Sequence, residues 1–209
     1  MFRASAAGMW SAQITVMTHI LVLYGTTHGH TAKIARAIAE TLRSQGASAD
    51  VVEANAEWPQ PEHYAAVVVA ASVHEGKYQR PVRRWVRANA DALNARPTAF
   101  VSVCLGVLQQ NPQVQQEVAA IMARFLTATG WRPAVTTTVA GALLYTRYNP
   151  FIRWAMKRIV RKAGGDTDTS RDYEYTDWAD LRAFAEDFGR RVARKASRDH
   201  AVPTGSLVA

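Results

Sequence analysis

Cysteine is almost absent from this chain of 209 residues, which contains Cys104 alone. One thiol can neither close an internal disulfide nor build a thiolate cage around a metal, so nothing here requires an oxidising compartment. Long apolar runs are lacking too, because charges or glycines interrupt each candidate before the ~18 residues that a membrane-spanning helix needs. We therefore expect a cytoplasmic protein whose chain does not cross the membrane.

The composition also lacks the marks of a disordered protein, since 48% of the residues are hydrophobic and 20% are charged. The length favours one domain with appendages rather than two full domains. We predict a flexible leader over residues 1–18, a domain over 19–196 and a flexible tail over 197–209. The apolar stretch of the leader is too short for a secretory signal. Three methionines are candidate translation starts: Met1, Met9 and Met17.

Acidic residues are absent from residues 141–165, a segment that matters because the chain has a net charge of +8. The segment holds six basic residues: Arg147, Arg153, Lys157, Arg158, Arg161 and Lys162. Most of the net charge thus lies in one short stretch. Such concentration beside aromatic residues favours an anionic membrane surface or a single anionic partner over nucleic acid.

Short runs of β-branched and small apolar residues predict five strands, and helical spacing of apolar residues predicts helices between them. The strands are expected at Ile20–Tyr24, Val51–Glu53, Ala66–Ala71, Ala99–Cys104 and Val135–Ala140, and the helices at 31–46, 81–93, 112–130 and 177–192. Thr31 is the expected cap of the first helix. This alternation predicts an α/β fold: a doubly wound, five-stranded parallel sheet with helices on both faces.

Ligands of such sheets bind beyond the carboxyl ends of the strands, which directs attention to the loops 25–31, 72–78 and 105–111. The first loop offers hydroxyls, backbone N–H groups and a helix N-terminus, which together suit a dianionic phosphate. It lacks the lysine of a P-loop and the third glycine of the dinucleotide fingerprint, so a mononucleotide fits better. A helix-capping turn without a ligand is the alternative.

The first loop resembles that of the flavodoxin family, Ser/Thr-x-Thr-Gly-x-Thr, which holds the phosphate of FMN. His28 departs from the pattern, because it stands where the family usually has threonine. The resemblance implies FMN as cofactor and these binding residues: Thr26, Thr27, His28, Gly29, His30, Thr31, Ser72, Val73, His74, Gly76, Tyr78, Cys104, Leu105 and Gly106. Gly76 would let the backbone approach the isoalloxazine. Tyr78 would pack on or near that ring, or would be an ordinary surface aromatic.

Further stretches resemble one subfamily, the menaquinone-dependent flavodoxin-like protoporphyrinogen oxidases. They are Pro97–Val103, Trp131–Pro133, Ala140–Leu143, Tyr145–Tyr148, Gly164–Thr169 and Tyr175–Trp178, and they follow in order across roughly residues 19–190. The resemblance implies FMN-dependent oxidation of protoporphyrinogen IX in haem biosynthesis, with electrons passed to menaquinone or ubiquinone at the inner face of the cell membrane. No catalytic side chain is predicted, because the flavin carries the chemistry.

The subfamily has an insert after the fifth strand, here residues 141–165, in which we predict a helix capped by Asn149 and ended by Gly164. Its apolar face comprises Phe151, Ile152, Ala155, Met156, Ile159, Val160 and Ala163, with Lys162 just inside its margin, and the basic residues opposite are Arg153, Lys157, Arg158 and Arg161. Such a helix binds an anionic bilayer, unless its apolar stripe packs on the sheet. The expected contacts to porphyrin propionates or lipid phosphates are Tyr145, Arg147, Tyr148, Arg153 and Lys157.

Two other functions stay open: a flavodoxin-type FMN electron carrier or quinone reductase serving other partners, and a flavin-free scaffold with a docking helix. Electron carriers of this type are typically acidic, unlike this chain. We predict no metal site, because Asp166 and Asp168 lack the remaining calcium ligands and His28 and His30 lack a third ligand. Cys104 ends a predicted buried strand, which favours packing over redox chemistry.

Overall fold

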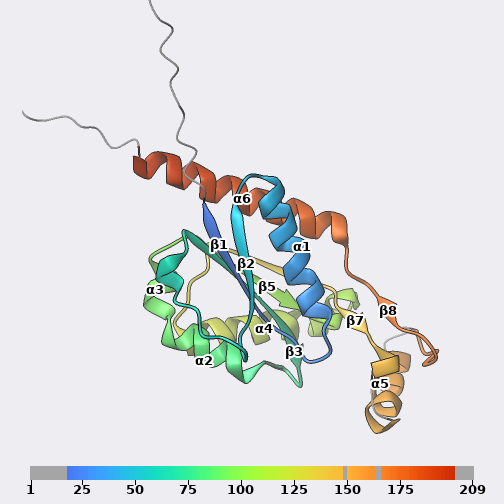
Figure 1. Ribbon diagram of the computed structural model, residues 1–209. Helices are drawn as coiled ribbons and strands as arrows, with labels where there is room; N and C mark the ends of the chain where they lie inside the picture. The colour runs from blue at the N-terminus through green and yellow to red at the C-terminus, as the bar shows by residue number, and fades with distance from the viewer. Residues whose placement is uncertain (1–17, 148–149, 163–165, 201–209) are drawn as a thin grey trace, which may run out of the picture.

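The computed structural model describes residues 18–147, 150–162 and 166–200 (Figure 1). The strands are β1 His19–Gly25, β2 Ser48–Glu53, β3 Ala66–His74, β4 Lys77–Tyr78, β5 Thr98–Val103, β6 Val135–Val139, β7 Ala142–Leu143 and β8 Tyr173–Glu174. The α-helices are α1 His30–Ser44, α2 Arg80–Ala88, α3 Ala90–Asn94, α4 Pro112–Thr129, α5 Pro150–Lys162 and α6 Trp178–His200. Short 3-10 turns span Pro61–His63, Leu105–Leu108 and Tyr145–Arg147.

The central sheet has the order β2-β1-β3-β5-β6, and all of these strands are parallel. Strand β4 adds an antiparallel segment at the end of β3. The chain winds from β1 to β2 on one side and then returns to place β3 on the other side of β1. The doubly wound parallel sheet predicted from the sequence is confirmed, and its switch point lies between β1 and β3.

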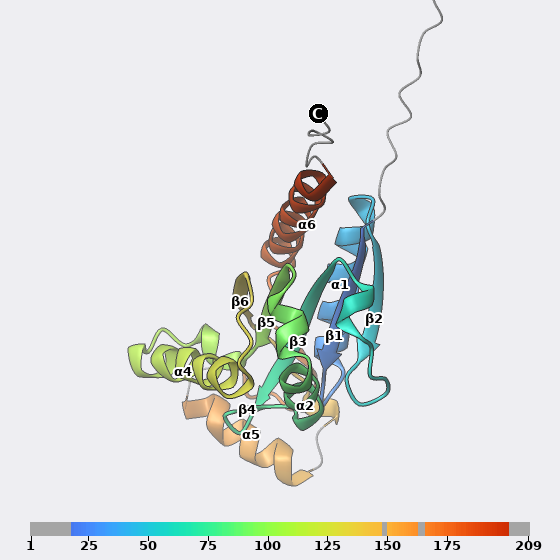
Figure 2. The ribbon, with the colours of Figure 1, turned by 90° about the vertical axis from the view of Figure 1, so that its left-hand side faces the viewer.

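Helices cover both faces of the sheet (Figures 1 and 2). Helices α1 and α6 lie on one face, over a cluster of small and branched apolar side chains that includes Ile34, Leu42 and Phe188. Helices α2 and α4 lie on the other face, over a more aromatic cluster that includes Trp85, Phe125 and Trp131. The three central strands, β1, β3 and β5, are apolar almost throughout because both of their faces are covered, whereas the edge strands β2 and β6 are more polar and mostly half-buried.

Several predicted boundaries were wrong. Ser72–His74 continue β3 rather than forming a loop, because Ser72 pairs with β5 and β4 pairs with Val73 and His74 across a turn in which Glu75 and Gly76 both have positive φ. The helix expected over 81–93 is two helices, since the side-chain amide of Asn89 donates to the carbonyl of Trp85 and ends α2. Helix α6 reaches His200, four residues into the segment predicted as a tail.

The described residues between β6 and α6 form a small layer of their own beside the carboxyl ends of the strands. They comprise the predicted insert and the segment 166–177 that follows it, and from here on 'the insert' means this whole region. Strands β7 and β8 pair, and Leu143, Tyr145 and Val160 form a third apolar cluster. Polar contacts hold the connection: the Tyr145 hydroxyl donates to the Asp166 carbonyl at 2.9 Å, and Thr146 donates to Asp172 at 2.9 Å. Within the described residues, no helix has the length and hydropathy to cross a membrane.

Candidate functional site

The first loop, between β1 and α1, turns at Gly29, which has a left-handed φ of 92° and is the N-cap of α1. The backbone N–H of Gly29 donates to Thr26 Oγ1 at 2.9 Å, which closes the loop on itself. The prediction that Thr31 caps the helix was wrong: the helix already begins at His30, and Thr31 is buried in its first turn. Glycine at the cap leaves no side chain over the helix N-terminus.

These features fit a bound phosphate. The first N–H groups of an α-helix have no intrahelical partner, and here neither a side-chain cap nor an acidic residue in the first turn occupies them. The helix dipole places partial positive charge at the same point. Thr27 is exposed beside it, and the Thr26 hydroxyl can donate while its oxygen accepts from Gly29. The residues present therefore suit an anion of the FMN type.

Gln79, at the start of α2, joins the first loop to β3. Its side-chain amide nitrogen donates to Ser72 Oγ at 2.6 Å and to Thr27 Oγ1 at 3.4 Å. Its amide oxygen is buried, with no hydrogen-bond partner among the described residues, and lies where a Cβ on Gly25 would meet it at 3.0 Å. Sequence reasoning missed Gln79; its position before Pro81 at a helix start was the available signal.

Two histidines face each other across the switch point. The rings of His28 in the first loop and His74 at the end of β3 meet edge to face, with centroids 5.6 Å apart. Burial lowers the pKa of both side chains below the ordinary histidine value, helped by Arg147 beside His28 and by His28 beside His74. Both rings are therefore neutral at pH 7, and they offer N–H donors and a polarisable surface rather than fixed charge.

The insert is attached to the first turn of α1 by hydrogen bonds. Thr176 Oγ1 lies 2.7 Å from His30 Nε2 and donates to the Ala140 carbonyl at 2.7 Å. Because the hydroxyl proton is used for Ala140, His30 Nε2 is the donor of the first bond, which sets the imidazole tautomer. Burial lowers the pKa of His30, so the ring is neutral. The sequence indicated neither Thr176 nor Ala140 as a partner of this loop.

An exposed ion pair supports the same attachment. Lys33 on α1 contacts the carboxylate of Glu174 on β8 at 2.8 Å, and the Trp178 indole N–H donates to it at 2.7 Å. The Lys33 ammonium also lies 4.8 Å from the centroid of the Trp178 ring. Burial opposes ionisation of Glu174, but these donors outweigh it and lower its pKa. The insert is thus fixed at the helix end that suits the phosphate.

Tyr78 is a core residue, which contradicts its predicted place on the flavin. Its side chain is buried under the β3–β4 hairpin, with ring centroids 5.1 Å from Phe100 and 4.8 Å from Phe125. Its hydroxyl is 2.8 Å from Ser102 Oγ, and burial raises its pKa to about 12. Period-2 alternation explains the error, because pairing of β4 with β3 turns this side chain toward the sheet. Gly76 lies at the hairpin tip, with positive φ.

The third loop lies between α4 and the insert. Cys104 donates its N–H to the Val139 carbonyl, and burial raises the pKa of its thiol, in keeping with a packing role. Leu105 packs against the third apolar cluster, in the insert. A Cβ on Gly106 would lie 2.8 Å from Val118 Cγ2, so only glycine lets the loop approach α4 this closely.

The residues predicted to contact substrate or lipid lie in different parts of the structure. Arg147 lies at the first loop, where its Nη1 donates to the His28 carbonyl at 3.0 Å. Tyr145 is fully buried, so the prediction that it contacts propionates or lipid was wrong; its ring fills the insert cluster. Arg153 and Lys157 are partly buried on α5. Tyr148 lies outside the described residues.

Helix α5 has the predicted position, and several of its residues can be placed. Arg158 and Arg161 are exposed, and Trp154 is 58% exposed, with the Arg158 guanidinium 5.3 Å from its ring centroid. Among the residues of the predicted apolar face, the side chain that the structure describes is Val160, which is buried against Leu143 and Tyr145. The caps Asn149 and Gly164 lie outside the described residues.

A first loop suited to phosphate, at the switch point of a 2-1-3-5-6 parallel sheet, is typical of a flavodoxin-type protein, and the Flavodoxin domain family matches residues 21–170. The chain belongs to this family. It is 36% identical over 168 residues to the protoporphyrinogen IX dehydrogenase [quinone] of Escherichia coli strain K12, covering 80% of this chain and 92% of that one. It is 34% identical over 174 residues to the Leishmania major protein of the same name, covering 80% of this chain and 73% of that one.

The same fold occurs in oxidised flavodoxin 1 from Bacillus cereus, which superposes with a TM-score of 0.52 at 14% identity. The superposition covers 83% of this chain and 98% of that one. At this identity the likeness shows the fold alone, and it confirms the flavodoxin-like architecture predicted from the sequence.

Proposed function

We propose that this protein is an FMN-dependent protoporphyrinogen IX oxidase that passes electrons to a membrane quinone, menaquinone or ubiquinone, in haem biosynthesis. The observation that carries the proposal is the 36% identity over 168 residues to a relative named for that reaction. A first loop suited to phosphate, at the switch point of a flavodoxin sheet, supports FMN as the cofactor. When bound, FMN would supply the redox chemistry, taking up the hydride equivalents of the porphyrinogen and passing them on to quinone.

The residues of the chain would hold and orient the cofactor rather than act as acid or base. Thr26, Thr27 and the N–H groups of the α1 first turn would bind the phosphate. The His28 and His74 rings stand beside this position and are neutral, so they add donors without opposing the charge of reduced flavin. Gly76 at the hairpin tip and Leu105 in the third loop would border the ring on either side.

The insert would bring the site to the membrane. Arg158 and Arg161 are exposed on α5, and Trp154 beside them suits the headgroup level of a bilayer. Each basic residue near an anionic surface contributes ~1 kcal/mol. Peripheral attachment at the inner face of the cell membrane would place the flavin next to quinone.

The test is quinone-dependent oxidation by purified protein loaded with FMN. We expect a yellow protein that converts protoporphyrinogen IX to fluorescent protoporphyrin IX when menaquinone or ubiquinone is supplied, with one FMN bound per chain. A flavin-loaded protein that reduces other carriers but leaves protoporphyrinogen unchanged would favour a flavodoxin-type electron carrier. A colourless protein that takes up no FMN would contradict the proposal altogether.

A further inference from the structure

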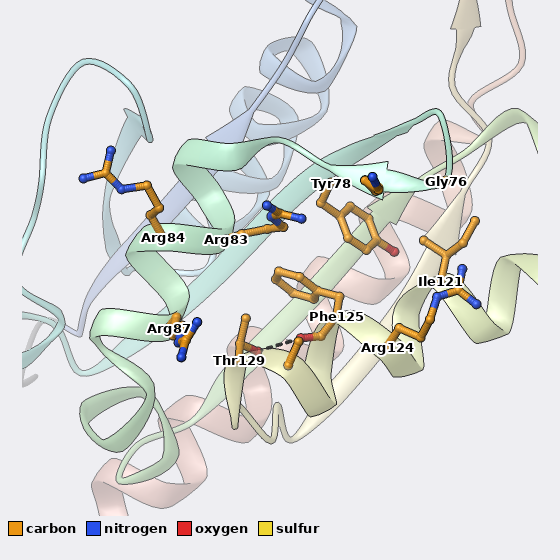
Figure 3. Close-up of a pocket in the computed structure, with 11 residues that line it drawn as sticks. Gly76, Tyr78, Arg83, Arg84, Arg87, Ile121, Arg124, Phe125 and Thr129 are labelled. Carbon is orange, nitrogen blue, oxygen red and sulfur yellow. Dashed lines mark hydrogen bonds between the residues drawn. The ribbon is translucent and has the colours of Figure 1, made fainter.

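A groove separates α2 from α4 on the sheet face opposite α1 and α6. It has a volume of about 430 Å³, within the range of small-molecule pockets. Figure 3 shows Arg83 and Arg87 on the α2 wall and Arg124 on the α4 wall, with Tyr78 and Phe125 between them. The groove extends to Gly76, at the hairpin tip that would border the flavin.

The groove is strongly and uniformly cationic. Its lining includes five basic residues and no acidic one: Lys77, Arg83, Arg84, Arg87 and Arg124. None of the five forms a salt bridge with another described residue. Arg84 points away from the other arginines in Figure 3, and its guanidinium lies 6.0 Å from the centroid of the Trp58 ring. Charges of one sign held together without counter-charge favour an anionic ligand.

The sequence explains how the cluster forms. Arg80, Arg83, Arg84 and Arg87 recur at spacings of three and four, so they share one side of α2, while Val82, Trp85 and Val86 are buried on the other. Arg124 comes from a helix that begins 32 positions after Arg80, and only the fold brings it opposite. Counting charge along the chain therefore overlooks this patch.

The base of the groove is apolar. Ile121, Phe125 and Ala128 of α4 line it together with Tyr78. An occupant must therefore combine an apolar or aromatic body with more than one anionic group. Guanidinium groups recognise carboxylates through paired hydrogen bonds, which makes three arginines on two walls suited to a dicarboxylate.

We propose that this groove is the carboxylate subsite for the tetrapyrrole, in which Arg83, Arg87 and Arg124 bind the two propionates while the macrocycle extends toward the hairpin tip. The inference rests on the proposed function for the identity of the ligand. In this proposal the substrate binds to a surface of the sheet domain, and the cationic helix α5 of the insert contacts the membrane. Figure 2 shows α5 at the same end of the molecule as β4, so both surfaces would border one approach to the flavin.

The experiment compares FMN-loaded wild type with the triple variant R83Q/R87Q/R124Q. The probes are protoporphyrin IX, which keeps both propionates, and its dimethyl ester, which has no charge. We expect the triple variant to bind protoporphyrin IX at least tenfold more weakly and the ester as wild type does. The KM for protoporphyrinogen IX should rise by a similar factor, with kcat unchanged.

Two further variants separate this role from a general effect of charge or folding. R36Q/R182Q/R194Q removes three exposed arginines from α1 and α6, on the opposite face, and should bind both probes like wild type. R83K/R87K/R124K keeps the charge but loses the paired geometry, so its affinity for protoporphyrin IX should lie between wild type and the glutamine variant.

Equal affinity of wild type and R83Q/R87Q/R124Q for protoporphyrin IX would overturn the subsite. So would a loss confined to binding of anionic lipid vesicles, which would make the groove a headgroup site. If the wild type fails to oxidise protoporphyrinogen but the triple variant still loses protoporphyrin binding, the proposed function fails while the groove stands as a porphyrin site. If wild type is active and the triple variant retains its KM, the groove fails alone.

Discussion

The sheet domain and the insert are stabilised in different ways. In the sheet domain, apolar strands and helices form two large clusters, and residues such as Val68, Trp85 and Phe100 are fully buried. In the insert, a cluster centred on Leu143, Tyr145 and Val160 is supplemented by hydrogen bonds to Asp166 and Asp172. Apolar burial is the main source of stability in the sheet domain, whereas the insert, with its smaller apolar cluster, also depends on a few directed hydrogen bonds.

This difference predicts that the two regions respond to different perturbations. Changes in exposed charge on the insert should alter partner contacts without affecting the fold. Changes where the insert meets α1 should affect both regions, because Arg147 contacts the loop that suits the phosphate and Thr176 and Glu174 contact the beginning of α1 beside it.

The largest effect is expected on membrane binding. K157Q/R158Q/R161Q removes three charges from α5, and at ~1 kcal/mol per basic residue it should weaken binding to anionic vesicles by about 100-fold. FMN affinity and thermal stability should stay at wild-type values. The matched control R182Q/R194Q/R198Q removes as much charge from exposed positions on α6 and should bind vesicles more nearly like wild type. Equal losses in both triples would mean that only net charge matters.

The next prediction concerns the hydrogen-bonded contact between the insert and the sheet domain. Thr176→Val removes the hydroxyl that joins His30 to the buried Ala140 carbonyl, leaving that carbonyl without this donor. Urea denaturation should show a loss of ~1–3 kcal/mol in the free energy of unfolding. Thr176→Ser retains the hydroxyl and should recover most of it. A Val variant as stable as wild type would show that this contact contributes nothing to the free energy of unfolding.

A third prediction concerns the first loop of the sheet domain. Gly29→Ala places a Cβ on a residue with φ of 92°, 3.0 Å from Arg147 Nη1. The left-handed conformation costs an L-residue ~1–2 kcal/mol. We expect the flavin-free loop of the variant to relax away from this conformation, so that FMN binding must restore it and the FMN affinity falls roughly tenfold. Flavin fluorescence titration measures this. Gly46→Ala, a left-handed glycine after α1 with open space around it, is the control for backbone strain and should leave FMN affinity unchanged.

The smallest effect concerns pH. The pKa values of His28, His30 and His74 are lowered in the fold, chiefly by burial, so the unfolded chain binds more protons than the native one once the pH falls below about 6.5. Stability should therefore decrease from pH 7.5 to pH 5.5. Across this pH range, the melting temperature of H28Q/H74Q should change less than that of the wild type. A melting temperature that rises on acidification would contradict the burial of these rings.

The sheet domain was largely predictable because each strand carries its own apolar pattern and each helix its own spacing. Residues 25–31 were correctly placed at the switch point for the same reason. Tyr78 was misplaced because its direction depends on β4 pairing with β3. Gln79 and Thr176 went unnoticed because the bond from Gln79 to Thr27 and the bond from Thr176 to Ala140 span 52 and 36 positions. The local pattern before Pro81 marks Gln79 as a helix start but does not indicate its partners. The arginine groove was missed because two helices form it together.

The bond between His30 and Thr176 has a thermodynamic consequence for the loaded protein. The first turn of α1 contacts the insert through His30, and its N–H groups are those proposed to bind the FMN phosphate, so the same turn would take part in both binding events. Linkage requires reciprocity: if FMN steadies the insert, a membrane that steadies the insert must tighten FMN to the same degree. Flavin loading and membrane attachment would then reinforce each other, and the flavin-free chain would be the form that leaves the bilayer.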